Sequence, residues 1–183
     1  MAKLPEILKV ETAAQSRLFR VERLALRFSN GVEVEFERIP SGSTIAAVIV
    51  VPLQDEGTVL LVREYAAGTH SYELGLPKGR AEPGEDLLDA ANRELMEEIG
   101  FGAERLEHLT ALSIAPNYIG HRTQVILARD LYPKRLPGDE PEPLEVVPWS
   151  LDDLEALVAR EDFSEARSLA ALYLVRDRLA RRG

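Results

Sequence analysis

Two continuous apolar runs and one amphipathic segment dominate the pattern of hydrophobic and polar positions in this chain. The runs at residues 45–53 (IAAVIVVPL) and 58–66 (TVLLVREYA) have the length of buried β-strands. Further along, apolar residues recur with the spacing of one helix face: Leu88, Ala91, Leu95 and Ile99. This pattern predicts a helix over residues 85–99, and Gly100 suits the left-handed position just past its C terminus.

Alternating positions predict a β-hairpin near the N terminus. Residues 18–28 alternate imperfectly, residues 32–39 alternate cleanly, and Asn30 with Gly31 between them provides hairpin-turn chemistry. We expect residues 1–16 to be a loosely structured lead. Because an isolated hairpin is only marginally stable in water, this one should pack on the following domain or on another subunit. We therefore expect a homodimer.

The remaining pattern divides the chain into a small N-terminal part and one larger domain. We expect an N-terminal β-hairpin subdomain for dimerisation in residues 1–42, and a main domain in residues 43–183. After the central helix, the pattern predicts three strands, at 106–113, 124–129 and 144–150, and two helices, at 151–160 and 164–181. Residues 133–143 hold four prolines and a cluster of acids, so they form neither a helix nor a central strand.

Composition and charge narrow the class of protein. A length of 183 residues suits one domain with a small appendage. The formal net charge of −9 argues against a protein that holds nucleic acid by neutralising backbone phosphates. The chain has no cysteine, which excludes disulfides, a thiolate zinc site and a cysteine nucleophile. Neither a signal pattern nor an apolar run of about 18 residues is seen, so we expect a cytoplasmic protein without membrane contact.

The central helix carries acids that need a partner. Glu94, Glu97 and Glu98 fall on one arc beside the apolar stripe, so like charges meet at the edge of the core. Arg93 can pair with Glu97 four residues on, which leaves Glu94 and Glu98 without a partner. A carboxylate pressed against apolar surface is costly unless positive charge compensates it. A hard divalent cation such as Mg²⁺, which prefers carboxylates and phosphates, would compensate the negative charge of these acids.

Three other features each have an ordinary and a functional interpretation. Arg63 either forms a surface salt bridge with Glu64 or binds a diphosphate with its guanidinium. The turn-forming segment before residue 79 could bring the main-chain carbonyl of Lys78 to a metal. The proline-rich loop could hold Glu140 or Glu142 at a defined position, or it could be a solvated acidic turn.

The residues around the helix also match a known motif. The spacing of eight fixed positions agrees with the Nudix box: Gly79, Glu85, Arg93, Glu94, Leu95, Glu97, Glu98 and Gly100. The chain therefore resembles the Nudix hydrolases. That resemblance implies an α+β protein with a Nudix α/β/α sandwich and a mixed sheet, here preceded by the N-terminal β-hairpin. It also implies hydrolysis of a nucleoside diphosphate linked to another moiety, with two or more Mg²⁺ or Mn²⁺ ions per site.

Features outside the box resemble one branch of that family. Pro116 lies sixteen residues after Gly100, as in the ADP-ribose pyrophosphatase branch, and segments such as REYAAGTHSYELGLPKG and GDEPEPL resemble the bacterial ADP-compounds hydrolases. The resemblance implies a small ADP-containing substrate, such as ADP-ribose, diadenosine triphosphate or NADH, and release of AMP. It also implies a dimeric architecture that includes the N-terminal hairpin.

The resemblance further implies a role for individual residues. Glu94 and Glu98 would be the principal metal ligands, supplemented by Glu97 and the Lys78 carbonyl. Glu142 would be the general base, with Glu140 in reserve. Arg93 would orient the acids through an ion pair, and Glu85 would brace the loop. Arg63, Glu64 and Glu73 would help to hold the diphosphate and the metals. The adenine is expected to stack on an aromatic side chain, with three candidates: Phe28, Tyr65 and Tyr118.

Two other functions stay open at this point. One is a Nudix-fold sensor that binds ADP-ribose or a similar nucleotide without turning it over. Such proteins usually lose acids of the box, whereas this chain keeps all of them. The other is an RNA-end pyrophosphohydrolase, against which the acidic charge and the missing basic stripe argue.

Overall fold

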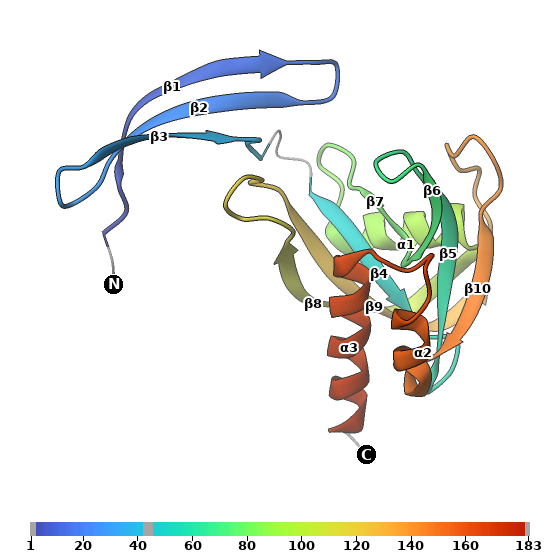
Figure 1. The fold of residues 1–183 in the computed structure, drawn as a ribbon. Helices are drawn as coiled ribbons and strands as arrows, with labels where there is room; N and C mark the ends of the chain where they lie inside the picture. Colours follow the sequence, from blue (N-terminus) through green and yellow to red (C-terminus); the bar gives the residue numbers. More distant parts are fainter. Residues whose placement is uncertain (1–2, 42–45, 182–183) are drawn as a thin grey trace. The chain divides into compact units, whose positions relative to one another are not determined.

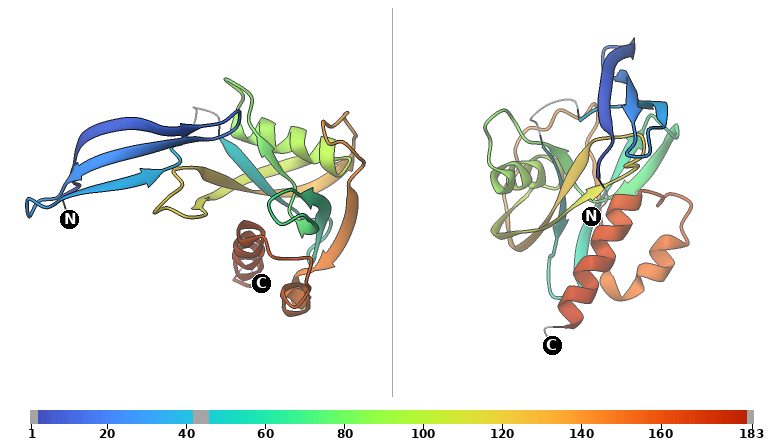
Figure 2. Two further views of the ribbon diagram at one scale, coloured as in Figure 1. Left: turned by 45° about the horizontal axis from the view of Figure 1, so that its top comes forward. Right: turned by 90° about the vertical axis from the view of Figure 1, so that its left-hand side faces the viewer.

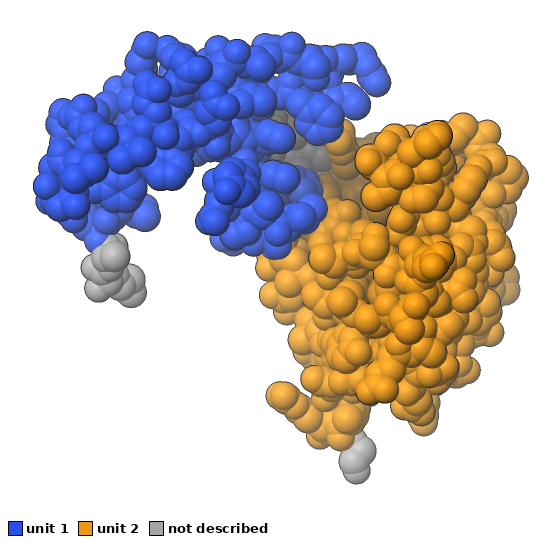
Figure 3. Space-filling view, in the orientation of Figure 1, with its two compact units in different colours: residues 1–44, 113–122 blue, residues 45–112, 123–183 orange. Residues whose placement is uncertain are grey.

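The computed structural model describes residues 3–41 and 46–181. The chain divides into two compact units (Figure 3). One consists of residues 1–44 and 113–122, and the other of residues 45–112 and 123–183. The boundary expected between residues 42 and 43 lies outside the described residues.

The first unit contains a three-stranded antiparallel sheet in the order β1-β2-β3. Its strands are β1 (Glu6–Gln15), β2 (Arg20–Arg27) and β3 (Glu33–Arg38). The predicted hairpin is confirmed as β2 and β3, with Gly31 at a φ of 83° in the turn between them. The prediction of a loosely structured lead is wrong, because most of it forms β1. Two register shifts in β1 interrupt its side-chain alternation and so hide the strand in the sequence pattern.

The loop of residues 113–122 belongs to the same unit. The Ile39 amide donates to the Tyr118 carbonyl at 2.7 Å, and the Gly120 amide donates to the Ile39 carbonyl at 2.9 Å. A Cβ on Gly120 would come within 2.8 Å of the Ser41 amide, so the close approach of the two segments requires glycine there. Pro116 therefore lies in a loop that is bound to the end of the N-terminal sheet.

The second unit is built on two sheets (Figures 1 and 2). The first has the strand order β7-β4-β9-β8, with β4 parallel to β9 and antiparallel to β7. The second has the order β10-β5-β6 and is antiparallel. The strands have these bounds: β4 (Ala47–Pro52), β5 (Thr58–Ala66), β6 (Ser71–Gly75), β7 (Lys78–Arg80), β8 (Phe101–Ser113), β9 (Arg122–Pro133) and β10 (Glu145–Ser150).

Helices cover both faces of these strands, because neighbouring residues of β4 point to opposite sides. Ile49 and Val51 pack in one core with α2 (Leu154–Val158) and α3 (Ala166–Ala180). Val48 and Val50 pack in a second core with α1 (Leu87–Glu98). Each fully buried aliphatic side chain stabilises the fold by about 1.5–3 kcal/mol. The predicted α/β/α sandwich with a mixed sheet is thus confirmed.

The bounds of some helices and strands differ from those that the sequence pattern predicts. Helix α1 agrees within two residues, and Gly100 has the predicted left-handed φ of 75°. Strand β8 starts five residues earlier than predicted, because it is an edge strand whose exposed charges mask the alternation. The predicted helix at 151–160 is a 3₁₀ turn (Leu151–Asp153) followed by α2. Among the described residues, no helix is long and apolar enough to cross a membrane.

Candidate active site

Helix α1 brings its acids to the short strand β7. The helix starts after Asp86, whose side chain accepts a hydrogen bond from the Leu88 amide and so caps the N-terminal end. Glu94 and Glu98 lie one turn apart and are only 7% and 5% exposed, whereas Glu97 is half-buried. Two buried carboxylates therefore stand at the edge of the apolar stripe, as the helical spacing predicts.

Arg93 ties the acids of the box together. It donates to Glu85 at 3.0 Å, to Glu94 at 3.0 Å and to Glu97 at 2.8 Å. It also donates to the Arg80 carbonyl at 2.8 Å. The expectation that Glu94 lacks a partner is therefore wrong, because Arg93 reaches three carboxylates instead of one. The hydrogen bond from Arg93 lowers the pKa of Glu85, which also accepts from a main-chain amide of its own loop.

Glu98 has a weaker partner. Both of its carboxylate oxygens lie 3.3 Å from the Lys78 amide, so the expectation of no partner is wrong here as well. A neutral amide offsets little of the cost of burying a charge. Burial is accordingly the main cause that raises the pKa of Glu98 to about 8, and it raises the pKa of Glu94 too.

This pair of acids fits a divalent cation. Hard cations such as Mg²⁺ bind carboxylate oxygens and leave other positions to water, carbonyl groups or phosphates. Buried carboxylates with too little positive charge nearby are a donor set of that kind. Within residues 3–41 and 46–181, no three acidic or histidine side chains gather closely enough to form a complete metal site alone. Ligands beyond Glu94 and Glu98 are therefore needed.

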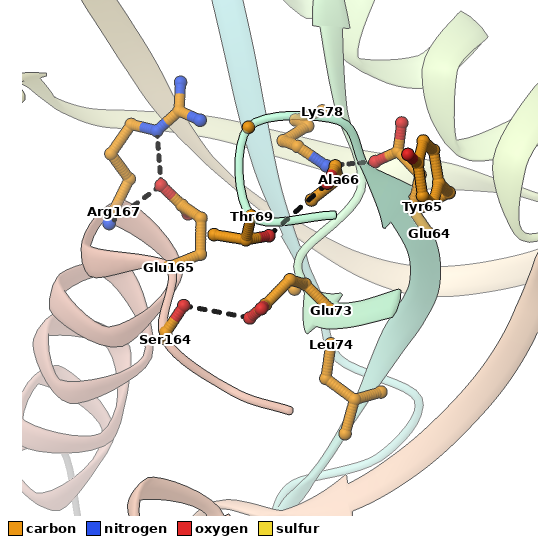
Figure 4. A pocket seen from close by; sticks show the side chains of 12 residues that line it. Glu64, Tyr65, Ala66, Thr69, Glu73, Leu74, Lys78, Ser164, Glu165 and Arg167 are labelled. Atoms are coloured by element: carbon orange, nitrogen blue, oxygen red, sulfur yellow. Dashed lines mark hydrogen bonds and ion pairs between the residues drawn. The ribbon is translucent and has the colours of Figure 1, made fainter. Parts of the chain in front are cut away.

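A pocket of about 310 Å³ lies between the β5–β6 hairpin and the start of α3 (Figure 4). Its lining is Glu64, Tyr65, Ala66, Gly68, Thr69, Glu73, Leu74, Gly75, Lys78, Ser164, Glu165 and Arg167. Lys78 joins the pocket to the helix, because its ammonium group pairs with Glu64 while its amide faces Glu98. Glu73 accepts hydrogen bonds from Ser71 and Ser164 at 2.9 Å each, and these bonds lower its pKa.

Arg63 lies apart from the pocket lining. Its guanidinium pairs with Glu145 at 2.8 Å and with Asp162. The expected partner, Glu64, pairs with Lys78 instead. Neighbouring residues of a strand point to opposite faces, so Arg63 and Glu64 project to different sides of β5. The structure thus places Glu64 and Glu73 in the pocket, and it gives Arg63 two carboxylate partners elsewhere.

The three aromatic candidates for adenine stacking occupy different places. Phe28 lies against Phe36 with ring centroids 6.4 Å apart, and Tyr118 is 66% exposed in the loop of the first unit. Tyr65 lines the pocket and makes an edge contact with Tyr72 at 5.8 Å. All three are exposed, so none of them is part of a hydrophobic core.

The acids of the proline-rich loop differ in their surroundings. Glu142 accepts a hydrogen bond from the Tyr72 hydroxyl at 2.5 Å, and Glu140 is half-buried. Asp139, which the sequence analysis did not single out, lies in the same loop, and its charge adds to the effects of burial and of Glu97 that raise the pKa of Glu94. The acidic composition of the loop was the only signal for it, and that signal does not distinguish between neighbouring acids.

The chain is similar to known proteins over nearly its whole length. The NUDIX domain model matches residues 43–172, and the model of the NudE-type Nudix hydrolase N-terminal domain matches residues 5–38. The ADP compounds hydrolase NudE of Escherichia coli (strain K12) is 51% identical over 179 residues, which are 98% of this chain and 95% of that protein. The ADP-ribose pyrophosphatase of Bacillus subtilis (strain 168) is 30% identical over 69% of each chain. A crystal structure of ADP compounds hydrolase, 50% identical, superposes with a TM-score of 0.92 over 100% of this chain and 98% of that one.

Proposed function

This chain belongs to the Nudix hydrolase family, and from that premise we propose how its acidic helix serves catalysis. The reaction is hydrolysis of the pyrophosphate bond of ADP-linked compounds, with release of AMP. The observation that carries this function is the pair of buried carboxylates: Glu94 accepts a hydrogen bond from Arg93, and Glu98 accepts from the Lys78 amide. Lys78 also lines the pocket. A hydrolase of this kind needs such a donor set for the cation that accompanies a diphosphate.

The substrates we propose are ADP-ribose, NADH and diadenosine triphosphate. Two relatives support this class: one is called an ADP compounds hydrolase and the other an ADP-ribose pyrophosphatase. The pocket that Lys78 lines has an aromatic wall, Tyr65, and a cationic group, the Lys78 ammonium. These groups suit a nucleotide, which has a flat ring and a charged diphosphate.

The cofactor we propose is Mg²⁺ or Mn²⁺, with two or more ions per site. Glu94 and Glu98 would be the principal ligands, and Glu97 and the Lys78 carbonyl would supplement them. When bound, the ions neutralise the diphosphate charge and lower the pKa of a water molecule. Arg93 holds Glu94 and Glu97 in place, and Glu85 fixes Arg93 to the preceding loop.

The proton of the attacking water goes to a carboxylate of the loop between β9 and β10. The oxygen of that water then bonds to phosphorus, and the bond to the bridging oxygen breaks. Glu142 is the base that the resemblance implies, with Glu140 in reserve. Glu64 and Glu73 line the pocket that receives the diphosphate. Arg63 has two carboxylate partners, so we propose that it reaches the substrate only if those ion pairs open.

We also propose a homodimer formed through the N-terminal sheet. The sheet has a contiguous apolar face, because the register pairs Val10 with Leu24, Leu24 with Phe36, and Leu26 with Val34. Val10, Val34 and Phe36 are 48%, 40% and 44% exposed. A contiguous exposed apolar patch on one sheet commonly marks a protein interface.

One assay tests this function and its alternatives. Purified protein is incubated with Mg²⁺ or Mn²⁺ and with ADP-ribose, NADH, diadenosine triphosphate or 5′-triphosphate RNA, and the products are separated by chromatography. Release of AMP from the first three supports the proposal. Binding of ADP-ribose without any product would indicate a sensor, and turnover of the RNA alone would indicate an RNA-end pyrophosphohydrolase.

A further inference from the structure

A buried hydroxyl group in the first turn of α3 takes no part in the mechanism proposed above. Among the described residues of the second unit, four polar side chains are buried: Glu94, Glu98, Thr123 and Ser168. The first two are the acids of α1, whereas Ser168 belongs to α3 and is 0% exposed. A buried hydroxyl is tolerated when it is hydrogen-bonded, so the partners of Ser168 show what this residue holds in place.

The Ser168 hydroxyl joins α3 to the turn between β6 and β7. It accepts a hydrogen bond from the Leu76 amide at 2.9 Å and donates one to the Glu165 carboxylate at 2.9 Å. A Cβ on Gly75 would lie 3.4 Å from the Ser168 hydroxyl oxygen, so the turn passes directly against the helix. Leu76 is 0% exposed. Water therefore has no access to replace the hydroxyl as the partner of the Leu76 amide.

Glu165 fixes the direction in which the hydroxyl donates. Its carboxylate caps α3 by accepting from the Ser168 amide at 2.8 Å, and it also accepts from the Arg167 guanidinium at 2.6 Å (Figure 4). Arg167 in turn donates to the hydroxyl of Thr123, on β9, at 3.2 Å. Because the Ser168 proton points to Glu165, a lone pair of the hydroxyl oxygen stays available for the Leu76 amide.

The turn that Ser168 holds leads directly to the acidic helix. Two residues after Leu76, the Lys78 amide lies 3.3 Å from both carboxylate oxygens of Glu98. Between them, the ring of Pro77 fixes its φ angle, and its carbonyl accepts from the Val50 amide at 2.9 Å. The turn is thus held by α3 at Leu76, by β4 at Pro77 and by α1 at Lys78.

We propose that Ser168 is a positioning residue for the main chain of Lys78 and, through it, for Glu98. This inference rests on the proposed function, in which Glu98 and the Lys78 carbonyl are metal ligands. A buried amide without a partner is costly, so the turn shifts when the hydroxyl is lost, and Lys78 moves with it. Ser168 does not line the pocket, so its loss should affect turnover more than substrate binding.

The test replaces Ser168 by alanine, which removes the hydroxyl oxygen alone. In the AMP-release assay with ADP-ribose and Mg²⁺, kcat should fall about tenfold because a ligand group is misplaced, and KM should stay within about twofold of the wild type. In a second measurement, Mn²⁺ is titrated into the metal-free full chain and free Mn²⁺ is followed by electron paramagnetic resonance. The affinity should fall about tenfold, a typical loss for a group that orients a metal ligand.

Two further variants separate positioning from a general loss of stability. Val175→Ala is the matched control, since Val175 is fully buried two turns farther along α3 and its truncation also destabilises the core. It should keep kcat and the Mn²⁺ affinity within about twofold. Ser168→Cys fills the same space with a sulfur that accepts hydrogen bonds weakly, so it should lower kcat without leaving a cavity. Circular dichroism checks that each variant is folded at the assay temperature.

The outcomes distinguish this inference from the proposed function. Wild-type kcat and Mn²⁺ affinity in Ser168→Ala or Ser168→Cys would overturn the role of Ser168. An equal loss in Val175→Ala would also overturn it, because general destabilisation would then be the cause. Glu98→Gln is the reference for the metal site itself. Unchanged Mn²⁺ binding in Glu98→Gln would reject the proposed metal site, and the inference with it, whereas lost binding there beside normal Ser168 variants would reject the inference alone.

Discussion

The backbone of Gly79 lies directly against the carboxylate of Glu94. A Cβ at position 79 would lie 2.0 Å from the carboxyl carbon of Glu94, and 2.1 and 2.2 Å from its two oxygens. The first glycine of the box therefore makes room for a buried acid of the helix. This contact brings β7 and α1 together and fixes the position of one proposed metal ligand.

Replacement of Gly79 by alanine should displace the Glu94 carboxylate. We expect kcat to fall by at least about 100-fold, because a misplaced ligand group loses the productive geometry. The assay is AMP release from ADP-ribose with Mg²⁺. Gly57→Ala is the matched control, since nothing lies within 4 Å of a Cβ there. A Gly79→Ala variant with normal turnover would show that the position of Glu94 is not essential.

Glu98→Gln should lower turnover strongly and leave the fold intact. Glutamine has nearly the same shape and still offers an acceptor to the Lys78 amide, but it has no charge for a cation. We expect kcat to fall by about 100-fold or more, with a melting temperature within about 2 °C of the wild type. Turnover is measured with Mg²⁺ and melting by fluorescence. Near-normal activity would contradict the assignment of Glu98 as a metal ligand.

Local signals in the sequence predict the acidic helix well, and partners distant in sequence are predicted poorly. The periodicity and Gly100 predict α1, and the turn residues predict the β2–β3 hairpin, because each depends on residues close together in the chain. The carboxylates that bind Arg63 are different: Asp162 is 99 residues away. Which carboxylate meets that guanidinium depends on how β5, β10 and the segment before α3 assemble.

Removal of Arg93 should destabilise the second unit as well as the site. Arg93→Ala leaves Glu85 and Glu94 without the guanidinium, and Glu94 is buried. Loss of one partner from a buried ion pair costs about 3–5 kcal/mol, and partial exposure of Arg93 reduces the expected loss to about 2–4 kcal/mol. Urea unfolding is followed by the fluorescence of Trp149, the single tryptophan. Arg105→Ala is the control and should leave the urea midpoint close to that of the wild type, because the Arg105–Asp130 pair is exposed.

Acid should weaken the contribution of Asp162. Hydrogen bonds from Arg160 and Arg63 hold its pKa well below the ordinary value of 3.8. A group with a depressed folded-state pKa stabilises the fold above its unfolded-state pKa, and this stability is lost as the pH falls through the folded value. Asp162→Asn should therefore be less stable than the wild type by about 1–2 kcal/mol at pH 7, and the difference should shrink below about pH 4. The stability difference between the two proteins is measured from their urea unfolding midpoints between pH 7 and pH 2. A difference that stays constant with pH would contradict the ion-pair explanation.

The apolar face of the N-terminal sheet predicts the effect of polar substitutions on assembly. Val34 and Phe36 are 40% and 44% exposed in the single chain, so serine at both positions should cost the sheet itself little. If these side chains lie at a dimer interface, burial of each one contributes roughly 1–2 kcal/mol to the free energy of dimer formation. The double variant loses this contribution in both subunits. Light scattering should give a mass of two 20.3 kDa chains for the wild type and of one chain for the double variant. Leu174→Ser on α3, where the leucine is 38% exposed, is the control and should stay dimeric. A monomeric wild type would reject the dimer, and a dimeric double variant would place the interface on another surface.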